Sequence, residues 1–96
     1  MTIEFRLDDD QRQLQATARK FAEQVMAPIA AECDEAHRFP MDVMRRGFDL
    51  GLMNLVIPAD FGGSGLGPIE RVLIAEELAW GCSGMATSLY ANFLAL

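Results

Sequence analysis

Residues 7–34 read LDDDQRQLQATARKFAEQVMAPIAAECD, and they set the architecture of this chain. Asp8 stands three residues before Gln11, which is the spacing of a capping box at a helix start. Behind this start, apolar residues recur every three or four positions: Leu14, Ala18, Phe21, Ala22, Val25 and Ile29. That period is typical of a helix with one buried face. We therefore predict one long helix, kinked or broken over residues 24–27 because Pro28 lacks a backbone donor.

Three shorter helices are predicted after this one. Pro40 suits the first position of a helix, and Gly51 suits its C-terminal cap. Pro68 begins the next helix in the same way, and that helix is expected to stop at Gly81. Ser83 is the candidate N-cap of a last helix that runs to the end of the chain. The apolar positions expected on the two middle helices are Val43, Met44, Phe48, Leu50, Ile69, Val72, Leu73, Leu78 and Ala79.

The connections support an all-α fold. Residues 52–57 form an apolar segment that is too short to be assigned as a strand, and residues 58–67 hold four glycines, as expected of a turn-rich connection. Residues 85–96 are apolar on nearly every face and carry no C-terminal capping signal, so this helix expects neighbours that the rest of the chain cannot supply. We predict an orthogonal or up-down helical bundle, truncated within its last helix.

Composition excludes several classes of function. The chain has 14 Asp and Glu residues against 8 Lys and Arg, a net charge of −6, and the basic residues never cluster, which argues against nucleic-acid binding. No apolar run reaches the length of a membrane span. The N-terminus lacks the pattern of a signal or transit peptide, so we expect a cytoplasmic protein. Cys33 and Cys82 are expected to be reduced structural thiols.

No residue set in the chain has the spacing of a complete active site. The glycines of residues 62–67 fail the dinucleotide-binding pattern and are interpreted as a tight turn. Glu76 and Glu77 point about 100° apart on a helix, so one is expected in solvent and the other in a buried hydrogen bond. His37 lacks a second ligand at metal spacing and is interpreted as a surface residue. We predict no catalytic residue and no metal site.

Several stretches, taken in order, resemble the N-terminal domain of the acyl-CoA dehydrogenases. They are Phe5 to Gln11, Phe21-Ala22, Ala27 to Glu32, Phe39-Pro40, Gly51 to Met53, Ile57-Pro58, Phe61 to Gly67 and Glu76 to Ser83. The resemblance covers essentially residues 1–96. It implies that this chain is the incomplete first domain of a longer protein, which would add a middle β-domain and a C-terminal helical domain.

The resemblance also implies an activity. Enzymes of this family oxidise acyl-CoA thioesters to trans-2-enoyl products: a glutamate removes the α-proton, and FAD accepts the β-hydrogen as hydride. Electrons then pass to an electron-transfer flavoprotein, and the enzymes are dimers or tetramers. The catalytic glutamate and most FAD contacts belong to the other domains, so the isolated chain is expected to bind no flavin and to be inactive. Because residues 85–96 are apolar on nearly every face, the isolated chain is also expected to self-associate through them.

In the family, the helix after the segment Glu76 to Ser83 forms one wall of the acyl-chain pocket. On that helix Thr87, Tyr90 and Leu94 are three and four residues apart, so they share a face and are the candidate substrate contacts. Leu94 is expected to set the depth of the pocket. Tyr90 departs from the medium-chain pattern, which leaves the preferred chain length open. The three side chains could instead only pack against the other domains.

Two alternatives stay open. An acyl-CoA oxidase or a flavin monooxygenase of the same fold would differ in its reaction with oxygen rather than in these residues. A non-enzymatic helical module would bind partners through its apolar last helix.

Overall fold

The computed structural model describes residues 6–91. Its helices are α1 (Asp9–Phe21), α2 (Ala27–Ala36), α3 (Met41–Asp49), α4 (Pro68–Gly81) and α5 (Ser83–Tyr90), with a π-helical segment η1 (Ala22–Met26) and a 3-10 turn η2 (Ala59–Phe61). No residue between 6 and 91 lies in a β-strand. The predicted all-α fold is confirmed.

The capping box at the start of α1 is confirmed. The backbone N–H of Gln11 donates to Asp8 Oδ1 at 2.7 Å, and the Gln11 side-chain oxygen accepts from the Asp8 N–H at 3.0 Å. Asp9 and Asp10 follow in the first turn, where the helix dipole favours negative charge.

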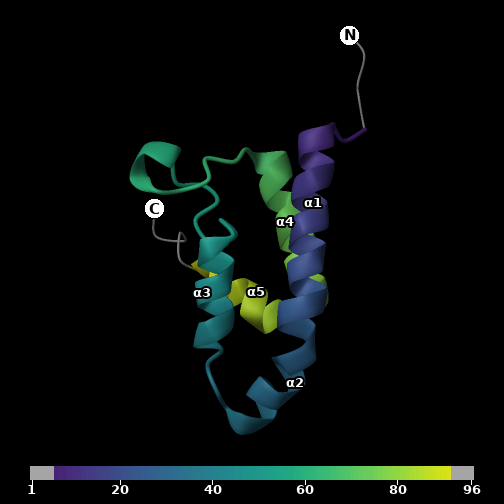
Figure 1. The fold of residues 1–96 in the computed structure, drawn as a ribbon, viewed down its shortest axis with the longest axis vertical. Coiled ribbons are helices and arrows are strands. Elements are labelled where there is room, and N and C mark those ends of the chain that lie inside the picture. Colours follow the sequence, from purple (N-terminus) through teal and green to yellow (C-terminus); the bar gives the residue numbers. More distant parts are fainter. Residues whose placement is uncertain (1–5, 92–96) are drawn as a thin grey trace.

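The predicted irregularity before Pro28 takes the form of a π-helical turn. Within η1 the Ala27 N–H donates to the Ala22 carbonyl, five residues earlier. Pro28 has no N–H to give the carbonyl of Gln24, so a regular α-helical ladder would be broken at this place. The wider turn redistributes the bonds, and the chain passes from α1 into α2 without leaving the helix, with α2 inclined to α1 (Figure 1).

Helices α1 and α4 lie side by side and run in the same direction (Figure 1). Gln11 bonds Glu70 near their N-termini, whereas at the other end Ala22 faces Gly81. A Cβ on Gly81 would come 2.7 Å from the Ala22 Cβ and 3.0 Å from the Ala22 oxygen. The two helices therefore approach closely because small residues stand at the crossing.

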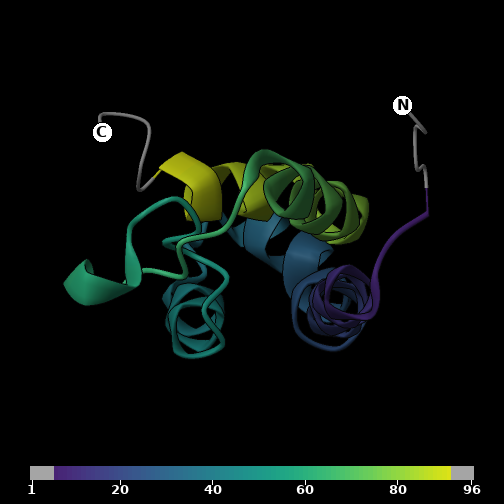
Figure 2. The same cartoon turned by 90° about the horizontal axis from the view of Figure 1, so that it is seen from above.

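Viewed from above, α1 and α3 form one layer, α4 and α5 form a second layer behind it, and α2 slants from α1 towards the second layer (Figure 2). Helix α5 crosses behind α3, where a Cβ on Gly47 would lie only 2.8 Å from Leu89 Cδ2. The core lies between the layers. Its fully buried larger side chains are Met26, Val43, Leu55, Ile74, Leu78 and Leu89.

Several expectations about single positions are wrong. Phe48 and Leu50 are more than half exposed, because α3 uses only the stripe Val43, Met44 and Gly47 against the core. On α4, Ile69 and Val72 are also exposed, while Ile74, which the expected stripe omitted, is fully buried. These errors share a cause: the shorter helices bury only one narrow face, and the period alone does not say which apolar residues occupy it.

Helix boundaries also differ slightly from the predictions. Pro40 is the N-cap of α3 rather than its first residue, and Cys82, not Ser83, is the N-cap of α5. Gly51 has the expected left-handed φ of 77° just beyond α3. Met85 and Leu89 are buried against the preceding helices, whereas Ser83, Gly84 and Thr87 are exposed, so these helices cover one side of α5 and do not surround it, as expected. Residues 92–96 lie outside the described residues.

Candidate functional site

The candidate site is the outer face of α5, and its orientation depends on one residue. Cys82 alone joins α4 to α5, with extended backbone angles of φ −170° and ψ 113°. Its N–H donates to the Leu78 carbonyl at 3.1 Å, and its own carbonyl accepts from the Ala86 N–H at 3.0 Å. Because both helices are bonded to this residue, α5 leaves α4 at a defined angle.

The rotation of α5 follows from its buried residues. Met85, Ala86 and Leu89 point into the core, which leaves Thr87 exposed. The Thr87 hydroxyl donates to the Ser83 carbonyl at 2.9 Å, so it is bonded within its own helix. Thr87 and Tyr90 lie three residues apart and share a side of α5. Leu94, the third predicted contact, lies outside the described residues.

Tyr90 connects this face to α4. Its hydroxyl donates to the Arg71 carbonyl at 2.8 Å. Burial of the phenol raises the pKa of Tyr90 to about 12, although the nearby Arg71 guanidinium lowers it. Tyr90 also lines a shallow groove of about 310 Å³ together with Pro68, Arg71, Val72 and Ala75. The ring is thus held against α4 beside this groove.

Sequence reasoning missed Arg71 as part of this site. Arg71 lies in the first turns of α4, nineteen residues before Tyr90, and no local pattern relates the two positions. Only the sharp turn at Cys82 brings the end of α5 back to the start of α4. A contact between the end of one helix and the start of the helix before it cannot be predicted from the spacing of residues within either helix.

The glycine-rich loop does not fit the phosphates of FAD. The backbone N–H groups of residues 61–66 are already bonded to carbonyls of residues 54–59. A Cβ on Gly63 would collide with the Ile57 carbonyl, so this glycine serves close packing of the chain on itself. A phosphate cradle needs free N–H groups. No step of flavin chemistry can therefore be assigned to this loop.

The paired carboxylates separate as predicted. Glu76 is exposed, whereas the Glu77 side chain is 15% exposed and accepts from Gln15 and from Arg19. The Arg19 guanidinium also donates a hydrogen bond to Glu23, and this bond raises the pKa of Arg19. The same guanidinium lies 3.4 Å from the centre of the Trp80 ring. This cluster ties α1 to α4 and holds no group that is free to act on a substrate.

A second groove, of about 390 Å³, lies between α2, residues 37–40 and α5. It contains His37, which is exposed as predicted, and both thiols, which are free. Between residues 6 and 91, no three His, Cys, Asp or Glu side chains are placed to hold a metal ion. No helix in that range is long and apolar enough to cross a membrane.

Comparison with known proteins settles the family. A model of the acyl-CoA dehydrogenase N-terminal domain matches residues 8–95. The chain belongs to the acyl-CoA dehydrogenase family. This acyl-CoA dehydrogenase domain is 39% identical over 94 residues to the probable medium-chain specific acyl-CoA dehydrogenase 2, mitochondrial, of Caenorhabditis briggsae, covering 98% of the chain and 23% of that protein.

Other relatives of the acyl-CoA dehydrogenase domain differ in their reactions. It is 39% identical to isobutyryl-CoA dehydrogenase, mitochondrial, of Bos taurus, over 90% of the chain and 20% of that protein. It is 36% identical to acryloyl-CoA reductase (NADH) of Anaerotignum propionicum, over 97% of the chain and 24% of that protein. The chain therefore spans less than a quarter of the length of these relatives.

A solved structure supports the same fold. The acyl-CoA dehydrogenase domain superposes with a TM-score of 0.85 and 31% identity on a chain from work on the electron transferring flavoprotein of Acidaminococcus fermentans and flavin-based electron bifurcation. The match covers 94% of this chain and 24% of that one.

Proposed function

We propose that this chain is the N-terminal domain of an FAD-dependent enzyme that oxidises acyl-CoA thioesters to trans-2-enoyl-CoA, and that the outer face of α5 forms one wall of its acyl-chain pocket. The observation that carries the proposal is the placement of Thr87 and Tyr90. Thr87 is exposed on α5, and Tyr90, three residues later, is half-buried at the edge of the core beside α4, while Met85, Ala86 and Leu89 are buried in the core. Membership of the family supports the reaction.

The side chains on this face suit an acyl chain more than a polar group. The Thr87 and Tyr90 hydroxyls are both bonded to backbone carbonyls. Their polar atoms are thus satisfied within the domain, so an apolar chain can lie against the face without leaving an unpaired donor. A dry wall would also exclude water from the reacting thioester and strengthen nearby hydrogen bonds.

FAD would supply the hydride acceptor in the full-length enzyme. Because the backbone N–H groups of residues 61–66 are already bonded, the cofactor would be held by parts of the protein other than this stretch. An electron-transfer flavoprotein is the proposed acceptor of the electrons. A homo-oligomeric state and a cytoplasmic location also stay predictions, and two of the relatives carry the word mitochondrial in their names.

The first test is a spectral titration of the full-length protein expressed from the complete gene. The flavin absorbance should bleach when acyl-CoA substrates of graded length are added under anaerobic conditions. Reoxidation by oxygen would separate an oxidase from a dehydrogenase. A folded but colourless protein would contradict the proposal and favour the interaction module.

Substitution at Tyr90 tests the pocket wall. Replacing Tyr90 with Ala removes the ring from α5, so the optimum of kcat/KM should move to longer acyl chains, by roughly tenfold for the favoured length. Phe48→Ala is the matched control, because Phe48 is an exposed ring on α3. An unchanged chain-length profile for Tyr90→Ala would remove Tyr90 from the site. Leu94→Trp tests the expected role of Leu94 in the same assay, with a shift to shorter chains expected.

A further inference from the structure

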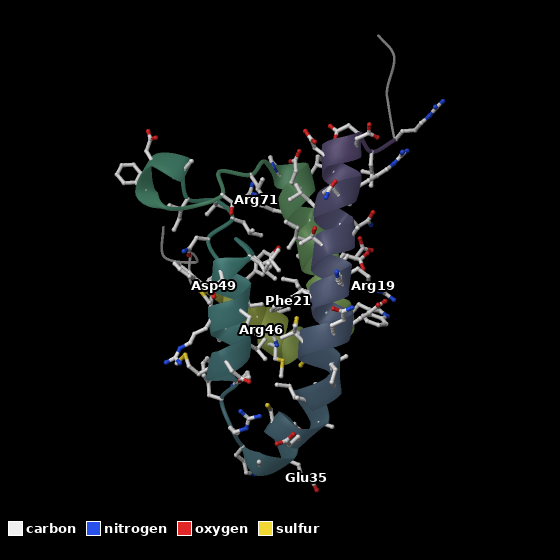
Figure 3. All side chains as sticks on the ribbon, viewed as in Figure 1. Arg19, Phe21, Glu35, Arg46, Asp49 and Arg71 are labelled. Atoms are coloured by element: carbon white, nitrogen blue, oxygen red, sulfur yellow. The ribbon has the colours of Figure 1, made fainter. Side chains whose placement is uncertain are left out.

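The groove beside Tyr90 has one charged group in an apolar setting. Its walls are Pro68, Val72, Ala75 and the Tyr90 ring, and Arg71 is the charged residue among those that line it. Val72 is 63% exposed, so the apolar side of the groove is open in this domain. Figure 3 shows Arg71 near the start of α4, on the side away from α1.

The Arg71 guanidinium has spare hydrogen-bonding capacity. Its Nε donates to the Gly67 carbonyl at 3.3 Å, which holds the side chain along α4. No carboxylate within the described part of the chain forms an ion pair with it, whereas Arg12 has one such partner and Arg19 and Arg38 have two each. The neighbouring Glu70 bonds Gln11 on the α1 side of the helix.

The charge of Arg71 lies close to Tyr90. The Tyr90 hydroxyl is bonded to the Arg71 carbonyl, and the guanidinium lowers the pKa of that phenol against the larger effect of burial. Arg71 is also near the positive end of the α4 dipole, which adds to the attraction for an anion. An anion bound at Arg71 would therefore sit next to the Tyr90 ring.

We propose that Arg71 binds a carboxylate at the far end of the acyl chain, so that the enzyme prefers thioesters of dicarboxylic acids. This inference rests on the proposed function, which places the chain against Thr87 and Tyr90. A chain that passes Tyr90 enters the groove and meets the guanidinium. A terminal carboxylate accepts two charge-assisted bonds there, whereas a terminal methyl group leaves the guanidinium desolvated and unpaired.

The test compares acyl-CoA pairs of equal carbon number on the full-length enzyme, one ending in a methyl group and one in a carboxylate. The wild type is expected to prefer the carboxylate. Arg71→Gln should lower kcat/KM for that substrate roughly ten- to hundredfold, mainly through KM, and should raise the methyl-terminated value, because the unpaired guanidinium that disfavours a methyl end is gone. Arg71→Lys should restore part of the loss, because it keeps the charge and loses the planar fork.

Arg45→Gln is the matched control, because Arg45 is an exposed arginine on α3 outside this groove. It should leave both substrates unchanged. The results also separate the two proposals. Flavin bleaching by methyl-terminated thioesters, with no preference for the carboxylate or with equal effects of Arg71→Gln on both, overturns the inference and leaves the proposed function standing. A protein whose flavin is bleached by neither class overturns both.

Discussion

Gly81 is needed at the crossing of α1 and α4 because a side chain there meets backbone atoms. Gly81→Ala should destabilise the domain by about 1–3 kcal/mol, since the added Cβ would lie 3.0 Å from the Ala22 oxygen and the helices must move apart. The loss should exceed the gain of up to about 1 kcal/mol that Ala gives over Gly in a helix. Thermal denaturation followed by circular dichroism measures the change.

Gly84→Ala is the matched control at the residue scale. Gly84 is exposed in α5, and its added Cβ would have only the Cys82 sulfur within 4.0 Å. This substitution should be neutral or slightly stabilising. Equal melting temperatures for the two variants would show that the close approach at Gly81 does not affect the free energy of unfolding.

The Tyr90 hydroxyl makes stability depend on pH in the alkaline range. At pH 7, Tyr90→Phe should cost about 1 kcal/mol, the typical value for one hydrogen bond. The pKa of Tyr90 is raised from 10 to about 12 in the folded state, so the folded form holds its proton more tightly than the unfolded form. The advantage of Tyr over Phe is therefore complete below pH 10 and is lost as the pH rises towards 12.

Denaturant titrations of both proteins at several pH values measure this difference. The gap between wild type and Tyr90→Phe should narrow between pH 10 and 12. A gap that stays constant over that range would mean that the phenol is not held as the structure describes.

Among the elements, α1 depends on its first turn for its start. Asp8→Ala removes the acceptor for the Gln11 N–H and should cost about 1 kcal/mol. The backbone amides of the first turn should exchange hydrogen faster in this variant. Asp10→Ala serves as the control, because it removes only a charge near the helix dipole, which is worth about 0.3–1 kcal/mol. Equal protection in the two variants would mean that the cap does not hold the turn.

At the scale of the whole molecule, stability should concentrate where α1 and α4 pack. Side chains with no exposed surface lie on both sides of this contact. They are Ala18 in α1, Ala22 and Met26 in the adjoining η1, and Ile74 and Leu78 in α4. Phe61, in contrast, is 81% exposed on its 3-10 turn. Hydrogen exchange should therefore be slowest for the amides of α1 and α4 and fastest around residues 58–62.

The amide of Leu66 provides a specific test of this order of hydrogen exchange. The Leu66 N–H is bonded to the Leu55 carbonyl at 2.8 Å, and Leu55 is fully buried. Leu66 should be protected although it lies in the same connection as Phe61. If the amide of Leu66 exchanged as fast as that of Phe61, the connection would be open rather than packed.

The helices themselves could be predicted from the sequence because their signals are local. The Asp8–Gln11 cap, the irregularity before Pro28, the start of α4 at Pro68 and the left-handed Gly51 all follow from bonds or steric limits within a few residues. The all-α class follows from these elements. The family was suggested by ordered motifs and is supported by the comparisons.

Burial and the candidate site depended on contacts between distant residues. Phe48 and Val43 lie on the same short helix, yet only Val43 faces the core, because α5 covers one side of α3. Arg71 joins Tyr90 only because the single residue Cys82 turns α5 back towards α4. Local sequence patterns specify which bonds a segment can make with itself. The partners of each helix face are set by how the helices pack, which depends on side chains that are far apart in the chain.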